Sequence, residues 1–277
     1  MNKRLHAVFG LKWNPFTPSV PAEALYLDNR ILSFVQRTRA LTTDGGFAMI
    51  TGEPGAGKSA ALRILSAELA QQRDVTVGTI SRPQASIADF YREAGYIFGV
   101  DLRPHNRWNG SRLLRERWQA HIDASLSRPV LIIDEAQELK PNVLSELRLM
   151  ASTRLDSYNL LTIVLAGDMR LVERLRSEEF LPLNSRMRVR LALERQDPTD
   201  LQSCLRHALD KAGVPTLITD DVIATMAEHA NGNLRTLMIM GDELLSAALE
   251  RDRRQIDSKL FFDVFPVPTA SKTPRRR

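Results

Sequence analysis

Gly52-Glu53-Pro54-Gly55-Ala56-Gly57-Lys58-Ser59 carries the strongest structural signal in this 277-residue chain. It matches G-x-x-x-x-G-K-[ST] at every fixed position, between an apolar run over 47–51 that predicts a buried strand and a helical pattern from 58 to about 72. Glycines let backbone N–H groups turn inward around a phosphate, and the helix N-terminus adds partial positive charge. We therefore predict a nucleoside-triphosphate site; the alternative is a glycine-rich turn with a chance lysine. The predicted nucleotide-binding residues of this loop are Gly52, Glu53, Pro54, Gly55, Ala56, Gly57, Lys58, Ser59 and Ala60.

A second part of the site follows the apolar run 130–133, which predicts a strand that ends at Asp134-Glu135. We expect Lys58 to contact the β- and γ-phosphates of ATP, and Ser59 and Asp134 to hold Mg²⁺. Glu135 would orient or deprotonate the attacking water. Two acids after a strand can also be a solvated strand end. Beside the phosphate loop, they predict ATP hydrolysis, and the Glu next to the Asp favours a hydrolase over a kinase, which must exclude water.

Strand and helix patterns alternate along the first two thirds of the chain. Further strands are predicted at 75–80 and 160–166, and helices at 28–41, 87–98, 111–126 and 141–153. This order predicts a mostly parallel sheet covered by helices on both faces. After about residue 196 the pattern is helical only. We expect an irregular, proline-containing N-terminal segment over 1–27, an α/β domain over 28–196, a small helical domain over 197–262 and a disordered basic tail over 263–277.

Composition limits the setting and the partners. Hydrophobic residues make up 43% and charged residues 26%, as in ordinary globular proteins. The single cysteine, Cys204, excludes a disulfide framework and favours a reducing, cytoplasmic location. The longest apolar run, Leu160 to Gly167, is too short to span a bilayer, and we expect no membrane partner. A net charge of +5 fits a polyanionic partner or an incidental mild excess of basic residues equally well.

Beyond the phosphate loop, the sequence resembles the AAA+ ATPases, whose helical domain forms a lid. Asp168, after the strand at 160–166, stands where that family keeps its first sensor, although Asn or Thr is commoner there. Arg186 is the first choice and Arg190 the second for an arginine finger that reaches a neighbouring subunit's γ-phosphate; a solvated basic strand edge is the alternative. Arg235 resembles the second sensor of the lid, or it is a plain helix-start arginine.

The N-terminal segment resembles that of a narrower AAA+ group. Residues 9–16, Phe-Gly-Leu-Lys-Trp-Asn-Pro-Phe, with Tyr26-Leu27, look like the entry segment of the ExeA-type ATPases and of the transposition regulators TnsC, TniB and IstB. The resemblance makes Pro15 and Phe16 candidate adenine contacts, unless they only anchor the N-terminus. ExeA-type proteins carry a transmembrane segment and a cell-wall-binding extension after the ATPase, so a sequence that ends at Arg277 favours a transposition regulator.

The resemblance implies head-to-tail homo-oligomers, as a filament or ring on duplex DNA, that mark a target and recruit a transposase, with hydrolysis driving disassembly. A target-selection protein is a further expected partner. The backbone phosphates would meet basic residues of the arginine-rich stretch 103–117 and its neighbourhood, which can equally form a solvated helix face. These candidate contacts are Arg103, Arg107, Arg112 and Lys140.

Two other functions remain open. One is an ATPase that remodels a protein partner, in secretion or assembly, without nucleic-acid binding. A replication initiator or helicase loader is the weaker option, because the sequence shows no recognition-helix domain.

Overall fold

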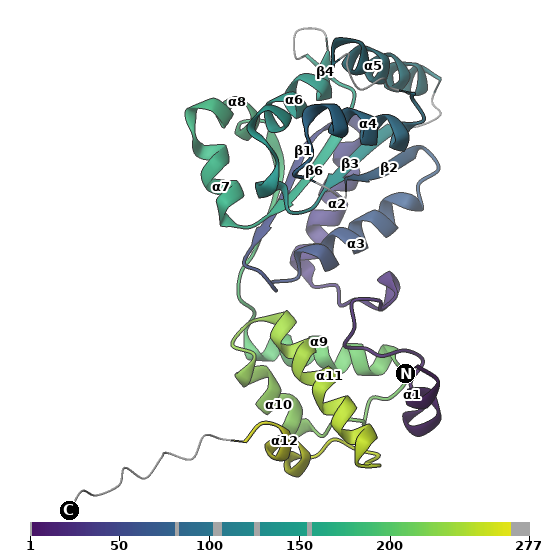
Figure 1. Ribbon diagram of the computed structural model, residues 1–277, viewed down its shortest axis with the longest axis vertical. Helices are drawn as coiled ribbons and strands as arrows, with labels where there is room; N and C mark the ends of the chain where they lie inside the picture. The colour runs from purple at the N-terminus through teal and green to yellow at the C-terminus, as the bar shows by residue number, and fades with distance from the viewer. Residues whose placement is uncertain (1, 81–82, 102–106, 125–127, 154–156, 267–277) are drawn as a thin grey trace, which may run out of the picture. The chain divides into compact units, whose positions relative to one another are not determined.

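The chain folds into two compact units in the computed structural model, which describes all residues except 1, 81–82, 102–106, 125–127, 154–156 and 267–277 (Figure 1). One unit is Leu27–Glu194, and the other joins Met1–Tyr26 to Arg195–Arg277. The first unit is an α/β domain, and the second is helical. From the sequence we expected residues 1–27 to form a segment of their own, whereas residues 2–26 belong to the helical unit.

The α/β unit is built on a five-stranded sheet in the order β2-β3-β6-β1-β7, in which every paired neighbour is parallel. The predicted mostly parallel sheet is confirmed. Its strands are β1 (Gly46–Gly52), β2 (Val75–Ile80), β3 (Arg128–Ile133), β6 (Thr162–Gly167) and β7 (Met187–Leu193). A two-residue pair, β4 (Ser152–Thr153) with β5 (Tyr158–Asn159), is separate and antiparallel.

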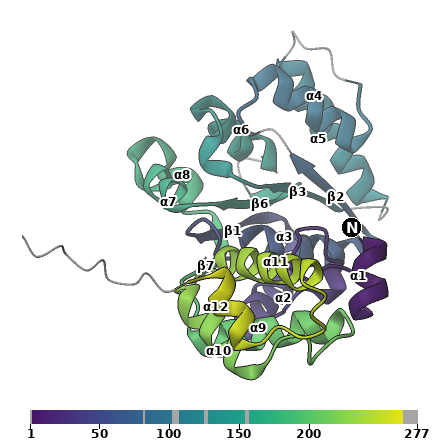
Figure 2. The same cartoon turned by 60° about the horizontal axis from the view of Figure 1, so that its bottom comes forward.

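Helices cover both faces of this sheet, as Figure 2 shows. On one side lie α2 (Asn29–Asp44) and α3 (Lys58–Ala70), and on the other α4 (Ile87–Phe98), α5 (Arg107–Asp123) and α6 (Pro141–Ala151). The turn η2 (Ala136–Glu138) follows β3, and α7 (Met169–Arg176), η3 (Glu178–Phe180) and α8 (Leu181–Asn184) connect β6 to β7. Each parallel crossover thus places a helix on the sheet, as βαβ connections require.

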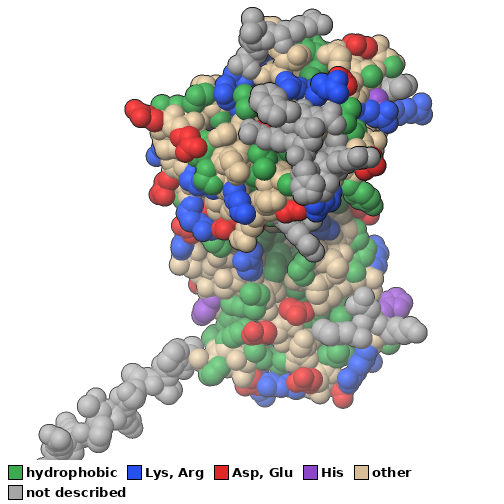
Figure 3. Space-filling model, turned by 45° about the horizontal axis from the view of Figure 1, so that its top comes forward, with side chains coloured by type: hydrophobic (Ala, Val, Ile, Leu, Met, Phe, Trp, Pro, Cys, Tyr) green, Lys and Arg blue, Asp and Glu red, His purple; other side chains and the backbone are tan. Residues whose placement is uncertain are grey.

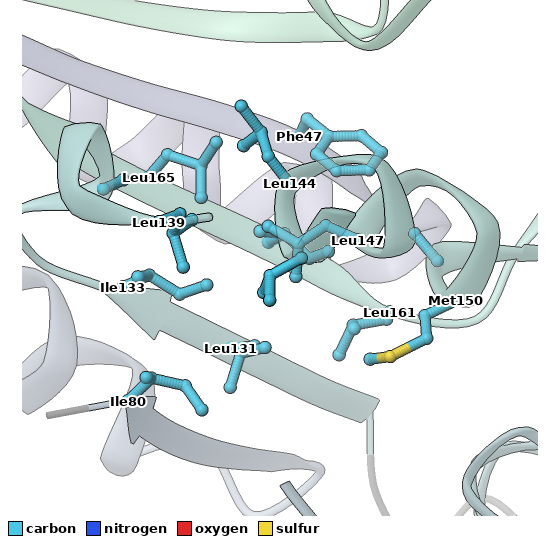
Figure 4. Packing of buried hydrophobic residues seen from close by; sticks show 14 of the residues in the cluster. Phe47, Ile80, Leu131, Ile133, Leu139, Leu144, Leu147, Met150, Leu161 and Leu165 are labelled. Carbon is cyan, nitrogen blue, oxygen red and sulfur yellow. The ribbon is translucent and has the colours of Figure 1, made fainter. Parts of the chain in front are cut away.

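The core of this unit lies mainly between the sheet and the α4–α6 layer. Leu131 and Ile133 of β3 meet Leu144 and Leu147 of α6 there, beside Leu165 of β6 (Figure 4). Because β3 and β6 are covered on both faces, they read as nearly continuous apolar runs, which is why the sequence identified them readily. Full burial of one such leucine contributes about 1.5–3 kcal/mol.

The sequence pattern did not predict β7 as a strand. Its buried and exposed residues alternate, because it is an edge strand with one face toward the core and one toward solvent. Arg188 and Arg190 occupy exposed positions, and they charge an edge that could otherwise pair with another strand. The conformation of this segment is therefore that of a basic edge strand, which the sequence left open as the alternative to an arginine finger.

The helical unit has its own core. Its helices are α1 (Asn2–Phe9), α9 (Pro198–Lys211), α10 (Asp220–His229), α11 (Leu234–Glu250) and α12 (Ser258–Val264), with a short turn η1 (Ala22–Ala24). The expectation of an irregular N-terminal segment is wrong at α1: apolar Leu5 of that helix and Leu11 after it are buried in this core, so tertiary packing outweighs weak local signals. In the described part of the chain, no helix combines the length and apolarity needed to cross a bilayer.

Candidate nucleotide site

The phosphate loop connects β1 to α3 at the carboxyl end of the sheet. Gly55 and Gly57 have φ angles of 87° and 100°, in the left-handed region that disfavours other residues. A Cβ on Gly52 would stand 2.5 Å from the carbonyl oxygen of Leu193, so this position has no room for a side chain. The three glycines are therefore needed by the loop's own conformation, and the loop ends at the N-terminus of α3, where partial positive charge favours an anion.

Lys58 is the first residue of α3, and it is only 6% exposed. Its Nζ donates hydrogen bonds to the carbonyl oxygens of Gly52, at 3.0 Å, and Glu53, at 3.2 Å. A buried ammonium group must be paired or hydrogen-bonded, and the loop backbone satisfies it here. The same three donor hydrogens can be offered to a phosphate in this loop.

Ser59 and Asp134 meet beside the loop. The hydroxyl of Ser59 donates to Oδ2 of Asp134 at 2.9 Å, and the other carboxylate oxygen accepts from the backbone N–H of Glu135 at 2.9 Å. A hydroxyl and a carboxylate are hard oxygen donors, the type that Mg²⁺ prefers. The donor set at this point therefore fits Mg²⁺ coordination.

Glu135 stands next to that pair, and its side chain is exposed. Its φ of 51° and ψ of 41° place it in the left-handed region, which costs a non-glycine residue on the order of 1–3 kcal/mol. Such a conformation persists only where the surroundings hold it. Here Oε2 of Glu135 accepts a hydrogen bond from Nε2 of Gln137 at 2.5 Å, a contact that the sequence analysis missed.

Asp168 caps α7 after β6. Its Oδ1 accepts from the backbone N–H of Arg170 at 2.9 Å, and its Oδ2 lies 2.8 Å from Nη2 of Arg170, which also contacts Glu138 at 3.0 Å. Partial burial alone would raise the pKa of Asp168, but hydrogen bonds from Arg170 and the positive charges of Arg170 and Lys58 outweigh it and lower this pKa below 3.8. Asp168 is thus an ionised acceptor, and the hydrogen-bond donor at this position is Arg170.

Arg186 and Arg190, the arginine-finger candidates, lie away from the phosphate loop of their own chain. β7 runs parallel to β1 with Met187 opposite Phe47 and Leu193 opposite Gly52. At about 3.3 Å per residue, the two ends of β7 are roughly 20 Å apart, and Arg186 precedes its first residue. Nη1 of the half-buried Arg186 is 3.5 Å from Oγ of Ser152, and Nη2 of Arg190 donates to Asn184 at 2.8 Å.

The remaining nucleotide candidates belong to the helical unit. Arg235 is an exposed residue in the first turn of α11, whose N-cap Asn233 accepts from the backbone N–H of Thr236. Pro15 and Phe16 are buried within this unit, and a Cβ on Gly241 of α11 would stand 2.5 Å from the Phe16 ring. This packing is what the anchoring alternative for Phe16 requires.

The candidate DNA contacts are spread over the α/β unit. Arg103 lies outside the described residues, and Arg107 opens α5 with a side chain that also lies outside them. Arg112 is exposed and pairs with Glu116 one turn later, 3.3 Å away. Lys140 is exposed at the N-cap of α6. On the face shown in Figure 3, basic and acidic side chains are interspersed, so the described residues there form no uniform basic surface. Trp118 is a core residue that packs against Phe98.

A hollow of about 990 Å³ adjoins Glu135. Residues of α4 and the segment before it line one part, and Glu135 and Glu138 the other, while the phosphate-loop residues take no part in it. The hollow therefore lies beside the phosphate site, and four acidic side chains surround it: Asp89, Glu93, Glu135 and Glu138.

Three relatives are similar over most of this chain. General secretion pathway protein A of Aeromonas hydrophila is 30% identical over 253 residues, which are 90% of this chain and 45% of that protein. The ATP-dependent target DNA activator B proteins of Escherichia phages Mu and D108 are each 28% identical over 251 residues, 83% of this chain and 73% of their own length. The chain thus spans less than half the length of the secretion protein.

Solved structures share the fold at low sequence identity. Cdc6p of Pyrobaculum aerophilum has a TM-score of 0.72 and 17% identity, covering 87% of this chain and 67% of its own. The ORC2 protein of Aeropyrum pernix has a TM-score of 0.70 and 15% identity, covering 91% of this chain and 70% of its own. The RuvB branch-migration motor of Thermotoga maritima has a TM-score of 0.58 and 16% identity, covering 91% of this chain and 72% of its own. Residues 41–175 match the AAA domain family. With its parallel sheet and phosphate loop, the chain contains an AAA+ ATPase domain, and it is similar over most of its length to these secretion and target-DNA-activator proteins.

Proposed function

We propose that this chain is an ATP-dependent, DNA-binding regulator of transposition that assembles on duplex target DNA. The observation that carries the proposal is the match to two target DNA activators over 83% of this chain and 73% of theirs. In this proposal the ATP-bound assembly recruits or activates a transposase in the cytoplasm, with or without a target-selection protein, and hydrolysis dissolves it.

The proposed chemistry is hydrolysis of the γ-phosphate. Lys58 and the loop N–H groups bind the phosphates, and Ser59 and Asp134 would hold Mg²⁺, which when bound neutralises phosphate charge. Glu135 accepts a proton from water as the water oxygen bonds to the γ-phosphorus. The bond from that phosphorus to the β–γ bridging oxygen breaks, which releases ADP and inorganic phosphate.

Assembly would complete the site. Because Arg186 precedes the far end of β7 in its own chain, it fits a role at another subunit's γ-phosphate, with Arg190 as the second choice. Arg235 is proposed as the second sensor, and Asp168, through its pairing with Arg170, as the first. Pro15 and Phe16 stay candidate adenine neighbours, with the burial of Phe16 favouring an anchoring role.

DNA would bind through its backbone phosphates, with Arg103, Arg107, Arg112 and Lys140 as the candidate contacts. Such contacts carry little sequence information and weaken as salt rises, because each releases condensed counterions. The Glu116 partner of Arg112 lowers the gain expected from that residue.

The test is binding to a random-sequence duplex with ATP, with ADP and without nucleotide, over a salt series, with the same samples imaged by negative stain. ATP-dependent filaments or rings that dissociate steeply with salt support the proposal. Absence of binding in every nucleotide state rejects it.

A second candidate is an ATPase that remodels a protein partner in secretion or assembly. The secretion relative favours it, since 90% of this chain matches that protein at 30% identity. This candidate predicts ATPase activity that responds to a protein partner and is unchanged by duplex DNA, so the same titration separates the two.

A further inference from the structure

Gln137 connects the two acids that the sequence placed in different motifs. It is 7% exposed, in the turn η2, two residues after Glu135. Its Nε2 donates to Oε2 of Glu135, and its Oε1 accepts from the backbone N–H of Asp168 at 3.2 Å. The partners fix the orientation of the amide, because a carboxylate only accepts and a backbone N–H only donates. Both polar groups of the Gln137 amide are therefore hydrogen-bonded within the protein.

The strand end beside Gln137 is shaped to admit this side chain. A Cβ on Gly167, the last residue of β6, would stand 2.6 Å from Oε1 of Gln137. Any larger residue there would displace the amide from the N–H of Asp168. The close approach is thus built into β6 as well as into η2.

A second helix holds the turn from the other side. Nη1 of Arg174 in α7 donates to the carbonyl oxygens of Gln137, at 2.6 Å, and Leu139, at 2.8 Å. Arg170, also of α7, reaches Glu138 in the same turn. Backbone and side chain of η2 are both tied to the segment that starts at Asp168, so η2 and the start of α7 are held together by charge-assisted bonds.

We propose that Gln137 is a positioning residue for hydrolysis, one that sets the direction of the Glu135 carboxylate and couples it to the position of Asp168. Glu135 is exposed and has a left-handed backbone, and the hydrogen bond from Gln137 orients its carboxylate. A shift of the Asp168 backbone, where a γ-phosphate sensor is expected, would move the amide and thereby the carboxylate. Pre-organisation of this kind acts on the rate of the chemical step more than on nucleotide affinity. The inference rests on the proposed role of Glu135 as the base.

The test compares single-turnover hydrolysis and nucleotide affinity in the full chain. Gln137→Met keeps the length and volume of the side chain and removes both hydrogen bonds. We expect the hydrolysis rate to fall about tenfold, a part of the ~10²–10⁴ that a positioned base contributes. The Kd for ATP should stay within about threefold, a change of less than 1 kcal/mol. Gln137→Glu keeps an oxygen that accepts from Asp168 but replaces the donor to Glu135, so it should also be slow. A Kd for ATP that is retained in both variants shows that they are folded.

Two further experiments distinguish the role of Gln137 from the role of Glu135 as the base. In a Glu135→Gln background, Gln137→Met should change the residual rate by less than about twofold, because a residue that acts through Glu135 has nothing left to position. Gln84→Met is the matched control: Gln84 donates to Glu138 at 3.2 Å and not to Glu135, and its loss should leave the rate unchanged. If Glu135→Gln is inactive while Gln137→Met hydrolyses normally, Gln137 has no positioning role. Wild-type hydrolysis by Glu135→Gln removes the base assignment itself.

Discussion

Ser59 and Asp134, 75 positions apart in the sequence, are joined by a 2.9 Å hydrogen bond at the carboxyl ends of β1 and β3. Ser59 is the second residue of the helix after the phosphate loop, and Asp134 follows a strand that is not paired with β1, because β6 lies between β3 and β1. The sheet therefore brings two local motifs together at one oxygen-rich site. Lys58 is the sequence neighbour of Ser59, and Glu135 is the sequence neighbour of Asp134.

Removal of the loop lysine is expected to weaken nucleotide binding strongly. Lys58→Ala deletes the charged donor of the loop, and hydrogen bonds to charged groups are worth about 1.5–3 kcal/mol, so ATP affinity should fall on the order of 10- to 100-fold. Calorimetric titration with ATP measures it, and ATP-dependent assembly should disappear at the same time. Lys259→Ala, an exposed lysine of α12, is the matched control. Unchanged ATP affinity in Lys58→Ala would exclude this loop as the binding site.

Loss of the proposed base should separate binding from hydrolysis. Glu135→Gln keeps the shape of the side chain but removes the proton acceptor, so hydrolysis should fall about 10²–10⁴-fold while ATP still binds. Assembly on DNA should then persist, since hydrolysis is the proposed step of disassembly. Phosphate release and negative-stain images of one sample report both properties. Hydrolysis at the wild-type rate contradicts the assignment.

Local motifs were the predictable part of this molecule. The phosphate loop and Asp134-Glu135 are contiguous in sequence, and the buried strands beside them have unbroken apolar runs. β7 escaped prediction because arginines alternate with its apolar residues, and α1 because its packing partners come from helices near the other end of the chain. Gln137 was missed for a similar reason: its contact with Asp168 spans 31 positions, and only the sheet brings the two together.

Asp168 gives a pH dependence with a definite sign. Its pKa is lowered in the folded chain, so its pairing with Arg170 stabilises the fold above the unfolded-state pKa near 3.8 and is lost as pH falls through the lower folded value. Asp168→Asn keeps an N-cap acceptor and removes the charge. We expect it to cost up to about 1 kcal/mol at pH 7, because Arg170 is largely exposed, and less below about pH 4. Denaturant unfolding of both proteins from pH 7 to pH 3.5 checks this, and a difference that grows on acidification would contradict it.

Phe16 should stabilise the helical unit without any nucleotide. Its ring is 5% exposed against Gly241, beside the hydrogen bond from Nδ2 of Asn14 to Oδ1 of Asp242 at 2.7 Å. Phe16→Ala is expected to cost about 3–5 kcal/mol, the usual range for a buried phenylalanine. Thermal unfolding of the nucleotide-free chain measures this loss, with Phe262→Ala, a half-exposed residue of α12, as control. A residue that served only as an adenine contact would leave the nucleotide-free stability unchanged.

Subunit mixing tests whether Arg186 acts on a neighbouring subunit. Arg186 precedes the end of β7 opposite the phosphate loop, so its own site should be intact but inactive in Arg186→Ala. Glu135→Gln lacks the base but keeps Arg186. At an interface where the Arg186→Ala site faces the arginine of a Glu135→Gln subunit, base and finger are both present. An equal mixture of the two inactive proteins should therefore recover up to about a quarter of the wild-type rate, the share of such interfaces in random head-to-tail assembly. Arg186→Ala mixed with the double variant should recover nothing, because no finger is present. If the first mixture stays as inactive as its components, Arg186 does not complete a neighbour's site, and Arg190 becomes the residue to examine in the same design.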